Sequence, residues 1–281
     1  FGWSANFIVG KLSTLFQVPP LTLNFYRWVL VWFLILPFTY KEILIKIPEI
    51  KKNIGLLLIL GITGVSIFNS VVYFALNFTQ VINAVLMISI IPVVVIFLSS
   101  ILKIEKFNLF QLLGLIVSLT GVLAIISQAE LNKILSLVFN KGDLWMLVAV
   151  LSWATYSTLL KKRKLPLKGL SLLQILITIG LFFLLPQYLG EHFIGKEVNF
   201  NKAFFLILFF VAIFPSIFAF YAWNKSIELI GANRSSIFLH LMPLFGAIMA
   251  VVIFEEKFEI YHLIGAAFIV TGIYLSNRKT Q

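Results

Sequence analysis

Polar residues placed inside long apolar runs are the groups of this chain best able to do chemistry. In the run 54–76 they are Ser66, Asn69, Ser70 and Tyr73, and spacings of three and four residues place them on one face of a helix. A polar group at membrane depth costs free energy unless it pairs or lines a cavity. We therefore predict that this face forms a cavity wall. The alternative is that the serine hydroxyls bond to their own helix backbone.

Aromatic and amide side chains in other apolar runs extend this candidate binding site. Its predicted members outside 54–76 are Trp3, Asn6, Trp153, Tyr156, Tyr221, Trp223 and His240. Tryptophan and tyrosine often mark the membrane interface. Trp3 and Trp153, however, both map near the middle of their runs, which favours cavity lining. Groups of this kind bind a small organic molecule through hydrogen bonds and ring contacts.

His240 is the histidine that lies well inside an apolar run, and its ordinary pKa of about 6.5 suits proton coupling. A neutral buried histidine bonded to a neighbour is the more common arrangement. No Asp or Glu lies deep in any run, and Glu228 sits near the end of one. If a proton drives this protein, His240 or Glu228 is predicted to mediate the coupling. Without either, facilitated diffusion or exchange is the more natural mechanism.

Arg27 is the charge that lies deep in an otherwise apolar run. An arginine there costs several kcal/mol unless it is paired, hydrated or able to reach the interface. Three roles are open: snorkelling outward, pairing with a helix end, or meeting an anionic group. We favour a structural role. Lys11 and Lys161 occupy matched places at the ends of two runs and are predicted to anchor the interface.

Pro92, Pro215 and Pro243 lie inside apolar runs. Proline removes a backbone donor and clashes with the preceding turn, so it kinks a helix. Pro92 and Pro243 hold matched positions, and we predict that all three prolines act as gating elements. The alternative is that the kinks are only tolerated.

Paired glycines predict two helices that pack closely. They are Gly114 with Gly121 and Gly265 with Gly272, each pair seven residues apart, about two helical turns. Small faces let helices approach closely in lipid. We predict that the runs 109–127 and 260–277 are packing and dimer helices.

Missing motifs exclude several function classes. The sequence has no cysteine, no Gly-x4-Gly-Lys-Ser/Thr, no His-Glu-x-x-His and no paired membrane carboxylates. We therefore predict no enzyme activity, no cofactor and no metal site. The net charge of +11 sits in short clusters between apolar runs, which indicates membrane topology and not nucleic-acid binding.

Composition and span length predict an integral membrane protein. The 281 residues are 60% hydrophobic and 12% charged, whereas soluble domains are about 45–50% apolar. Continuous apolar runs of about 20 residues predict helices and not membrane strands. The ten expected spans are 1–14, 21–40, 54–76, 84–102, 109–127, 143–160, 169–190, 203–224, 233–254 and 260–277. We expect the first to be incomplete, with about eight to ten residues preceding Phe1.

Loop charge predicts the orientation. Segments 41–52, 103–106, 161–168, 225–234 and 278–279 carry +11 in total, and the opposite loops carry −1. The positive-inside rule places both termini in the cytoplasm.

The sequence is internally repeated. Ile91-Pro92-Val93 recurs as Met242-Pro243-Leu244, and Glu105-Lys106-Phe107 as Glu256-Lys257-Phe258, each 151 residues later. Trp3 and Lys11 match Trp153 and Lys161 at an offset of 150. With five spans per half, the second half enters the membrane inverted. Inverted repeats are typical of transporters with a substrate site between the halves.

These segments resemble the EamA family of the drug/metabolite transporter superfamily, over nearly the whole chain. The resemblance rests on Glu105-Lys106-Phe107-Asn108 with Gln111, Gly114 and Gly121, on Glu256-Lys257-Phe258-Glu259 with His262, Gly265 and Gly272, and on Trp3-Ser4-Ala5-Asn6, Lys11, Phe25-Tyr26-Arg27 and Ala75-Leu76. It implies ten helices in two five-helix bundles, a central cavity, alternating access, and small metabolites such as amino acids, drugs or nucleotide precursors as substrates.

The expected fold class is thus all-α: a polytopic membrane protein of ten transmembrane helices, as two inverted five-helix repeats at 1–127 and 143–277. We predict a secondary transporter of small organic metabolites across the inner membrane, with amino acids favoured and export as the direction. Expected partners are that substrate and membrane lipids, not nucleic acid, with the chain a monomer or homodimer. One alternative is a carrier of nucleotide-linked or anionic metabolites, which requires Arg27 or Lys11 to face the cavity. The other is a membrane-embedded protein without transport activity.

Overall fold

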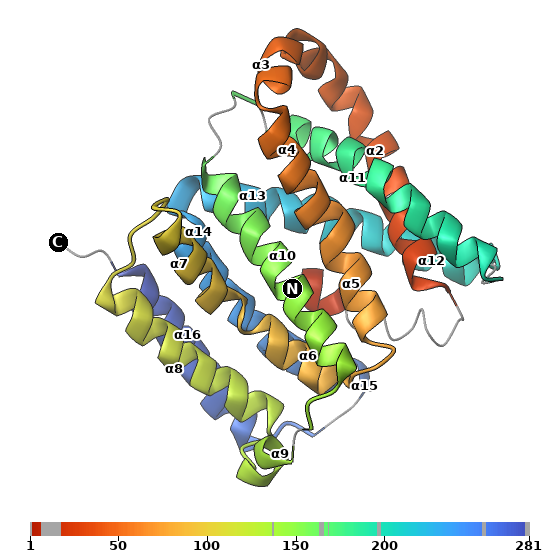
Figure 1. The fold of residues 1–281 in the computed structure, drawn as a ribbon. Coiled ribbons are helices and arrows are strands. Elements are labelled where there is room, and N and C mark those ends of the chain that lie inside the picture. The colour runs from red at the N-terminus through yellow and green to blue at the C-terminus, as the bar shows by residue number, and fades with distance from the viewer. Residues whose placement is uncertain are drawn as a thin grey trace.

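The computed structural model describes residues 2–6, 18–136, 138–162, 166–167, 169–195, 198–254 and 257–278. Every regular element among them is helical (Figure 1). Residues 2–6 are helical and precede α2 (Pro20–Ile45), α3 (Ile47–Lys52), α4 (Ile54–Leu60), η1 (Gly61–Ile67), α5 (Phe68–Ala75), α6 (Val81–Ile88), α7 (Ile91–Ile101), α8 (Leu109–Ile126) and α9 (Leu131–Leu135). The later elements are α10 (Lys141–Lys162), α11 (Gly169–Phe193), α12 (Lys202–Val211), η2 (Ala212–Phe218), α13 (Ala219–Ile230), α14 (Ala232–Ser236), η3 (Ile237–His240), α15 (Leu241–Phe254) and α16 (Ile260–Asn277).

Eight helical stretches of the described chain are long and apolar enough to cross a membrane, and the protein is an all-α polytopic membrane protein. They correspond to eight of the ten expected spans. The expected span 233–254 is helical but is divided among α14, η3 and α15. The expected span 1–14 falls largely outside the described residues, as does Lys11.

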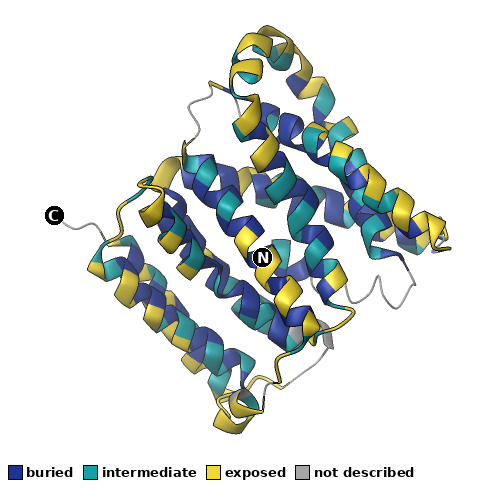
Figure 2. Cartoon of the chain, viewed as in Figure 1, coloured by how far each residue is buried: buried dark blue, intermediate teal, exposed yellow. Residues whose placement is uncertain are grey.

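α10 lies at the centre of the molecule. The helix has 61% of its apolar window buried, the largest share among the eight spans, because other helices surround it. Figure 2 shows buried residues facing this interior, while exposed residues cover the outer faces. Large hydrophobics such as Phe38, Phe182 and Val252 are among those exposed. An apolar exterior of this kind is the surface that lipid covers.

Two π-helical segments interrupt equivalent spans of the two halves. η1 and η2 begin at Gly61 and Ala212, and the two starts are 151 residues apart. In η2, Pro215 has no backbone N–H to give to the carbonyl of Val211. The Ser216 hydroxyl donates to that carbonyl instead, at 2.6 Å. π-turns inside α-helices frequently occur at functional sites.

Pro92 lies at the start of a helix, whereas Pro243 lies inside the helical run 232–254, just after its 3-10 segment. Pro92 is in the first turn of α7, after α6 ends at Ile88, and Pro243 is two residues into α15, after η3. A first turn tolerates proline because its N–H would have no intrahelical partner. At Pro92 the expected kink is therefore a break between α6 and α7, whereas at Pro243 it coincides with the change from the 3-10 turn η3 to α15 within one helical run.

The predicted glycine packing is confirmed within one chain. α8 and α16 form the most extensive helix contact of the described structure and lie side by side (Figure 1). A Cβ on Gly272 would lie 2.5 Å from the carbonyl oxygen of Gly114, and one on Gly121 would lie 2.6 Å from that of Gly265. Backbone therefore meets backbone along this contact, which we call the glycine seam.

The two helices of the seam also begin in the same way. Asn108 and Gln111 form a capping box at the start of α8, and Glu259 and His262 form one at the start of α16. These residues are 151 positions apart in the sequence, so both halves reuse one helix start.

α2 and α11 are joined at both ends by a carboxylate. Glu191 accepts from the amide and hydroxyl of Thr22 at 2.7 and 2.9 Å. At the other end, the hydroxyl of Ser171 donates to Glu42 at 2.6 Å. Thr22 with Ser171, and Glu42 with Glu191, are each 149 residues apart, so these two helices are equivalent at that offset.

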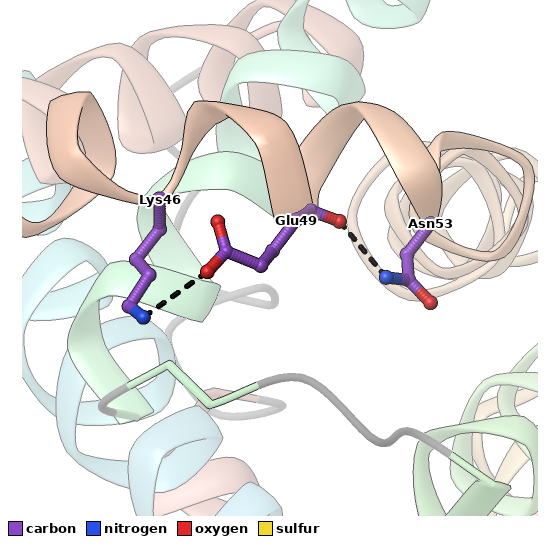
Figure 3. Close-up of polar contacts among 3 residues, drawn as sticks. All are labelled: Lys46, Glu49 and Asn53. Atoms are coloured by element: carbon purple, nitrogen blue, oxygen red, sulfur yellow. Dashed lines mark hydrogen bonds and ion pairs between the residues drawn. The ribbon is translucent and has the colours of Figure 1, made fainter.

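A polar contact fixes the connection from α2 to α4 (Figure 3). The Lys46 ammonium lies 3.2 Å from a carboxylate oxygen of Glu49, and the Asn53 side-chain amide donates to the Glu49 carbonyl at 2.8 Å. The backbone amide of Glu49 itself, followed by Lys46, holds the pKa of the Glu49 carboxyl below its usual value. Both side chains are partly exposed.

Glu105 fastens the end of the first half to the second half. Its two carboxylate oxygens accept from the amides of Ala232 and Asn233, each at 2.9 Å, at the start of α14. Gly231 precedes them with φ +88°, in the left-handed region, and packs against the same carboxylate. Glu105 thus anchors the start of α14, and its counterpart Glu256 lies outside the described residues.

Candidate functional site

Three tryptophans from both halves meet in an aromatic cluster. The ring centroids of Trp3 and Trp153 are 5.2 Å apart, and Trp223 lies 5.4 Å from Trp3 and 5.7 Å from Trp153. Phe220 and Tyr156 flank Trp153 at 5.3 and 5.1 Å. Trp3 and Trp153 are equivalent positions of the two halves, so the cluster forms where the halves cross.

Hydrogen bonds hold most of these rings. The Trp3 indole N–H donates to the carbonyl of Pro215 at 2.9 Å, in the π-turn, and that of Trp223 donates to Ser157 at 3.2 Å. The Tyr156 hydroxyl donates to Asn224 at 2.5 Å. The Trp153 Nε1 is buried and has no hydrogen-bond partner among the described residues. An unused donor beside a ring cluster can bind a ligand.

A polar face of α2 lies beside the cluster. Asn24, Arg27 and Trp28 follow a spacing of three and four residues and have side chains at most 1% exposed. The Asn24 amide donates to Ser70 at 3.2 Å, and the Arg27 Cζ lies 4.8 Å from the Trp28 ring centre. Phe220 lies 5.0 Å from the Trp28 ring and so joins this face to the cluster.

The predicted polar face of α5 is divided between two neighbours. Ser66, in η1, accepts from Gln187 of α11 at 2.9 Å, whereas Ser70 faces Asn24 of α2. Asn69 is buried, and its Nδ2 has no hydrogen-bond partner among the described residues. Tyr73, one turn further along, is close enough to interact electrostatically with Arg27.

These groups define what we call the central site: Trp3, Asn24, Arg27, Trp28, Asn69, Trp153, Phe220 and Trp223. Asn6, from the same helical segment as Trp3, also has a buried Oδ1 without a described partner. An apolar cavity of about 550 Å³ opens beside the site, between Trp3, Trp223, Phe214 and Met242. Its volume is in the range of small-molecule pockets.

Tyr221 and Glu228 lie elsewhere. Tyr221 is 41% exposed and lines a separate recess of about 340 Å³ with Asn224, Lys225 and Glu228. The Lys225 ammonium is 2.7 Å from Glu228. Tyr221 and Trp223 are two residues apart, about 200° around a helix, so they cannot share a face.

His240 lies beside the glycine seam. Its Nε2 is 2.9 Å from the carbonyl of Ser89, which can only accept, and its Nδ1 is 2.6 Å from the hydroxyl of Ser118 in α8. Ser89 and His240 are equivalent positions, 151 residues apart, so the bond joins the two halves. Both ring nitrogens have partners, which fits the neutral bonded histidine that we considered the more common arrangement.

Sequence reasoning missed Asn24, Trp28 and Phe220 as site members and favoured a structural role for Arg27. The sequence did contain a signal for Asn24, Arg27 and Trp28, because their spacing places them on one face of a helix. Arg27 does not reach the protein surface, since it is only 1% exposed.

Comparison with known proteins supplies the family. The model of the EamA-like transporter family matches residues 1–127 and 140–278. The chain belongs to the EamA-like transporter family. This family points to a two-domain repeat arrangement and is non-enzymatic. The protein is accordingly a multi-pass secondary transporter.

Two relatives of this EamA-like transporter are themselves named as transporters, and a solved structure has a similar fold. An uncharacterized transporter of Archaeoglobus fulgidus is 28% identical over 277 residues, covering 99% of this chain and 94% of the relative. The uncharacterized transporter YyaM of Bacillus subtilis is 27% identical, covering 82% and 75%. A solved crystal structure, 17% identical, superposes with a TM-score of 0.72 over 98% of this chain and 94% of its own, which supports the fold alone.

Proposed function

We propose that this EamA-like transporter moves small amphipathic organic metabolites, amino acids first among them, by alternating access. The observation that supports it is the central site itself. It combines an aromatic wall with buried polar atoms that have no partner among the described residues. Apolar surface with a few placed polar groups is the usual composition of a small-molecule site.

The topology we propose has ten spans in two inverted repeats, 1–127 and 143–277, with both termini cytoplasmic. The eight helical stretches long enough to cross a membrane, the helical run 232–254 and the π-turns at equivalent places support it. Loop charge supports this orientation, and the inner membrane is the location that we propose. The outer faces of α8 and α16 are apolar and exposed, which suits lipid or a second copy in a homodimer.

Gating is proposed at three prolines. Pro92 marks the break between α6 and α7, and Pro243 follows the change from η3 to α15. Pro215 lies in η2, and its carbonyl accepts a hydrogen bond from Trp3. Movement of one bundle against the other would change these joints and the contacts of Trp3 together. Export is the direction proposed. Where a proton is coupled, His240 between the halves is the proposed mediator, with Glu228 as the second choice.

Transport of radiolabelled amino acids into proteoliposomes, with and without a pH gradient, tests this function. Saturable uptake by the wild type is expected, and Trp153→Ala or Asn69→Ala should abolish it because both residues contribute unpaired donors to the site. Trp145→Ala is the matched control, since Trp145 lies on the same helix but is 43% exposed. Equal loss in Trp145→Ala, or no effect of Trp153→Ala, would place the site elsewhere.

A further inference from the structure

We propose that Arg27 is the anion subsite of the central site and that the substrate carries a carboxylate group. This inference rests on the proposed transport function and specifies its substrate class. It excludes amines, esters, amides and neutral drugs as preferred substrates.

The first argument is that the Arg27 guanidinium is buried, stacks on the Trp28 ring, and has two nitrogens without a hydrogen-bond partner among the described residues. The residue is 1% exposed, and its Nε and Nη2 bond to none of the residues that the structure describes. Unpaired charge in a low-dielectric interior is among the most costly features of a protein, and proteins pair such charges. Glu191, which packs against the start of the same helix, is bound to Thr22. A ligand anion would fill the empty donor positions.

The second argument comes from the other half of the chain. At the offset of 149 that relates α2 to α11, Asn24, Arg27 and Trp28 correspond to Leu173, Leu176 and Ile177. The three apolar counterparts are all fully buried. A helix in this place therefore folds and packs with leucine where α2 has arginine. Packing does not require the charge, which leaves ligand binding as its use.

The third argument is chemical fit. A guanidinium presents parallel N–H donors that match the two oxygens of a carboxylate. Asn69 adds a free buried donor, and Asn24 a free buried acceptor that suits an ammonium. Trp28 lies between Arg27 and Phe220, and Phe220 contacts Trp3 and Trp153. A carboxylate at Arg27 would thus place the apolar part of the molecule against the aromatic wall.

Matched probes test this inference in proteoliposomes that contain the full chain. The probes are L-phenylalanine, 3-phenylpropionate and L-phenylalaninamide, which keep the ring and vary the charged groups. The wild type should move the two carboxylates and not the amide. Arg27→Gln should lower carboxylate transport at least about 30-fold, and Arg27→Lys should retain part of it. Lys46→Gln, which removes a cation from the surface pair with Glu49, is the control and should transport normally.

Transport of phenylalaninamide as fast as phenylalanine, or full activity of Arg27→Gln, would overturn the inference and leave the transport function standing. If the wild type moves none of a broad metabolite panel, the transport function fails by itself. The thermal unfolding midpoint of ligand-free Arg27→Met in detergent then tests whether Arg27 serves a ligand or stabilises the fold. A midpoint equal to or above the wild type supports an arginine kept for a ligand, because an unpaired charge has been removed. A clearly lower midpoint means that Arg27 is structural and overturns the inference.

Discussion

The glycine seam and the central site differ in how far the two halves match. Along the seam, Gly114 and Gly121 correspond to Gly265 and Gly272, and the capping boxes correspond as well. In the central site, Arg27 corresponds to Leu176 and Asn69 to Phe220. Only the tryptophan pair, Trp3 and Trp153, is kept in both halves there.

The difference has a physical cause. Two halves of one fold need the same close contacts, so residues that serve packing recur. A small metabolite has no such two-fold symmetry, because its charged and apolar ends differ. Residues that bind it therefore need not recur, and a polar group whose counterpart is apolar points to the ligand. In a repeated transporter, mismatch between halves is thus a guide to the site.

The largest expected effect is at the seam. Gly272→Ala should destabilise the protein by about 1–3 kcal/mol, because the new methyl group would lie 2.5 Å from backbone atoms of Gly114 and Ser118. Thermal unfolding of the purified protein in detergent measures it. Gly55→Ala in α4 is the control, since its Cβ meets nothing within 4 Å. That change should be neutral or stabilising by about 0.5–1 kcal/mol. Equal midpoints for the two variants would contradict the seam.

A smaller effect is expected where the halves are joined by Glu105. Glu105→Gln keeps one acceptor for Ala232 and Asn233 but removes the charge and the second acceptor, a loss of about 1–2 kcal/mol. Hydrogen exchange measured by mass spectrometry should be faster in the peptide that contains 232–233. Glu228→Gln, at an exposed position, should leave that peptide unchanged. Unchanged exchange in Glu105→Gln would show that the carboxylate does not hold α14.

The smallest effect is expected at the surface, far from both regions. Lys46→Gln should raise the pKa of Glu49 but leave it below its usual value, because the Glu49 amide is the larger cause of the lowering. A lowered carboxyl pKa stabilises the fold at neutral pH, and this contribution is lost as the pH falls through the folded-state pKa. NMR titration of labelled glutamate measures the shift. A pKa that returns fully to the usual value would make Lys46 the main cause.

The sequence predicted local features well. Glycine spacing and span length depend on neighbours along one helix, and Gly114 and the eight long helices agree with them. The repeat itself was readable from residues 151 positions apart. The expected kink at Pro92 is a break between two helices and that at Pro243 a change from 3-10 to α-helix, which residue type alone cannot distinguish from a bent helix.

The central site was harder to predict because it depends on contacts between helices. Ser66 and Ser70 share a face of an ideal helix, but the π-turn η1 changes the register, and the two residues contact different helices. Arg27 was placed in a structural role because its burial cannot be read from spacing. Tyr221 was included in the predicted site because of its residue type. Its position about 200° around the helix from Trp223 argued against that placement.

Single-cysteine labelling tests the central claim most directly. The claim is that the central site, where the two halves differ, opens to water while the glycine seam stays closed. The chain has no cysteine, so each introduced thiol is unique. Ser70→Cys, at the hydrogen-bond partner of Asn24 in the central site, and Ser118→Cys in the seam are matched, since both serines are at most 5% exposed. The account predicts that a membrane-impermeant thiol reagent modifies Ser70→Cys from either side of the membrane and does not modify Ser118→Cys. Equal reactivity at the two positions, or none at Ser70→Cys from either side, would contradict it.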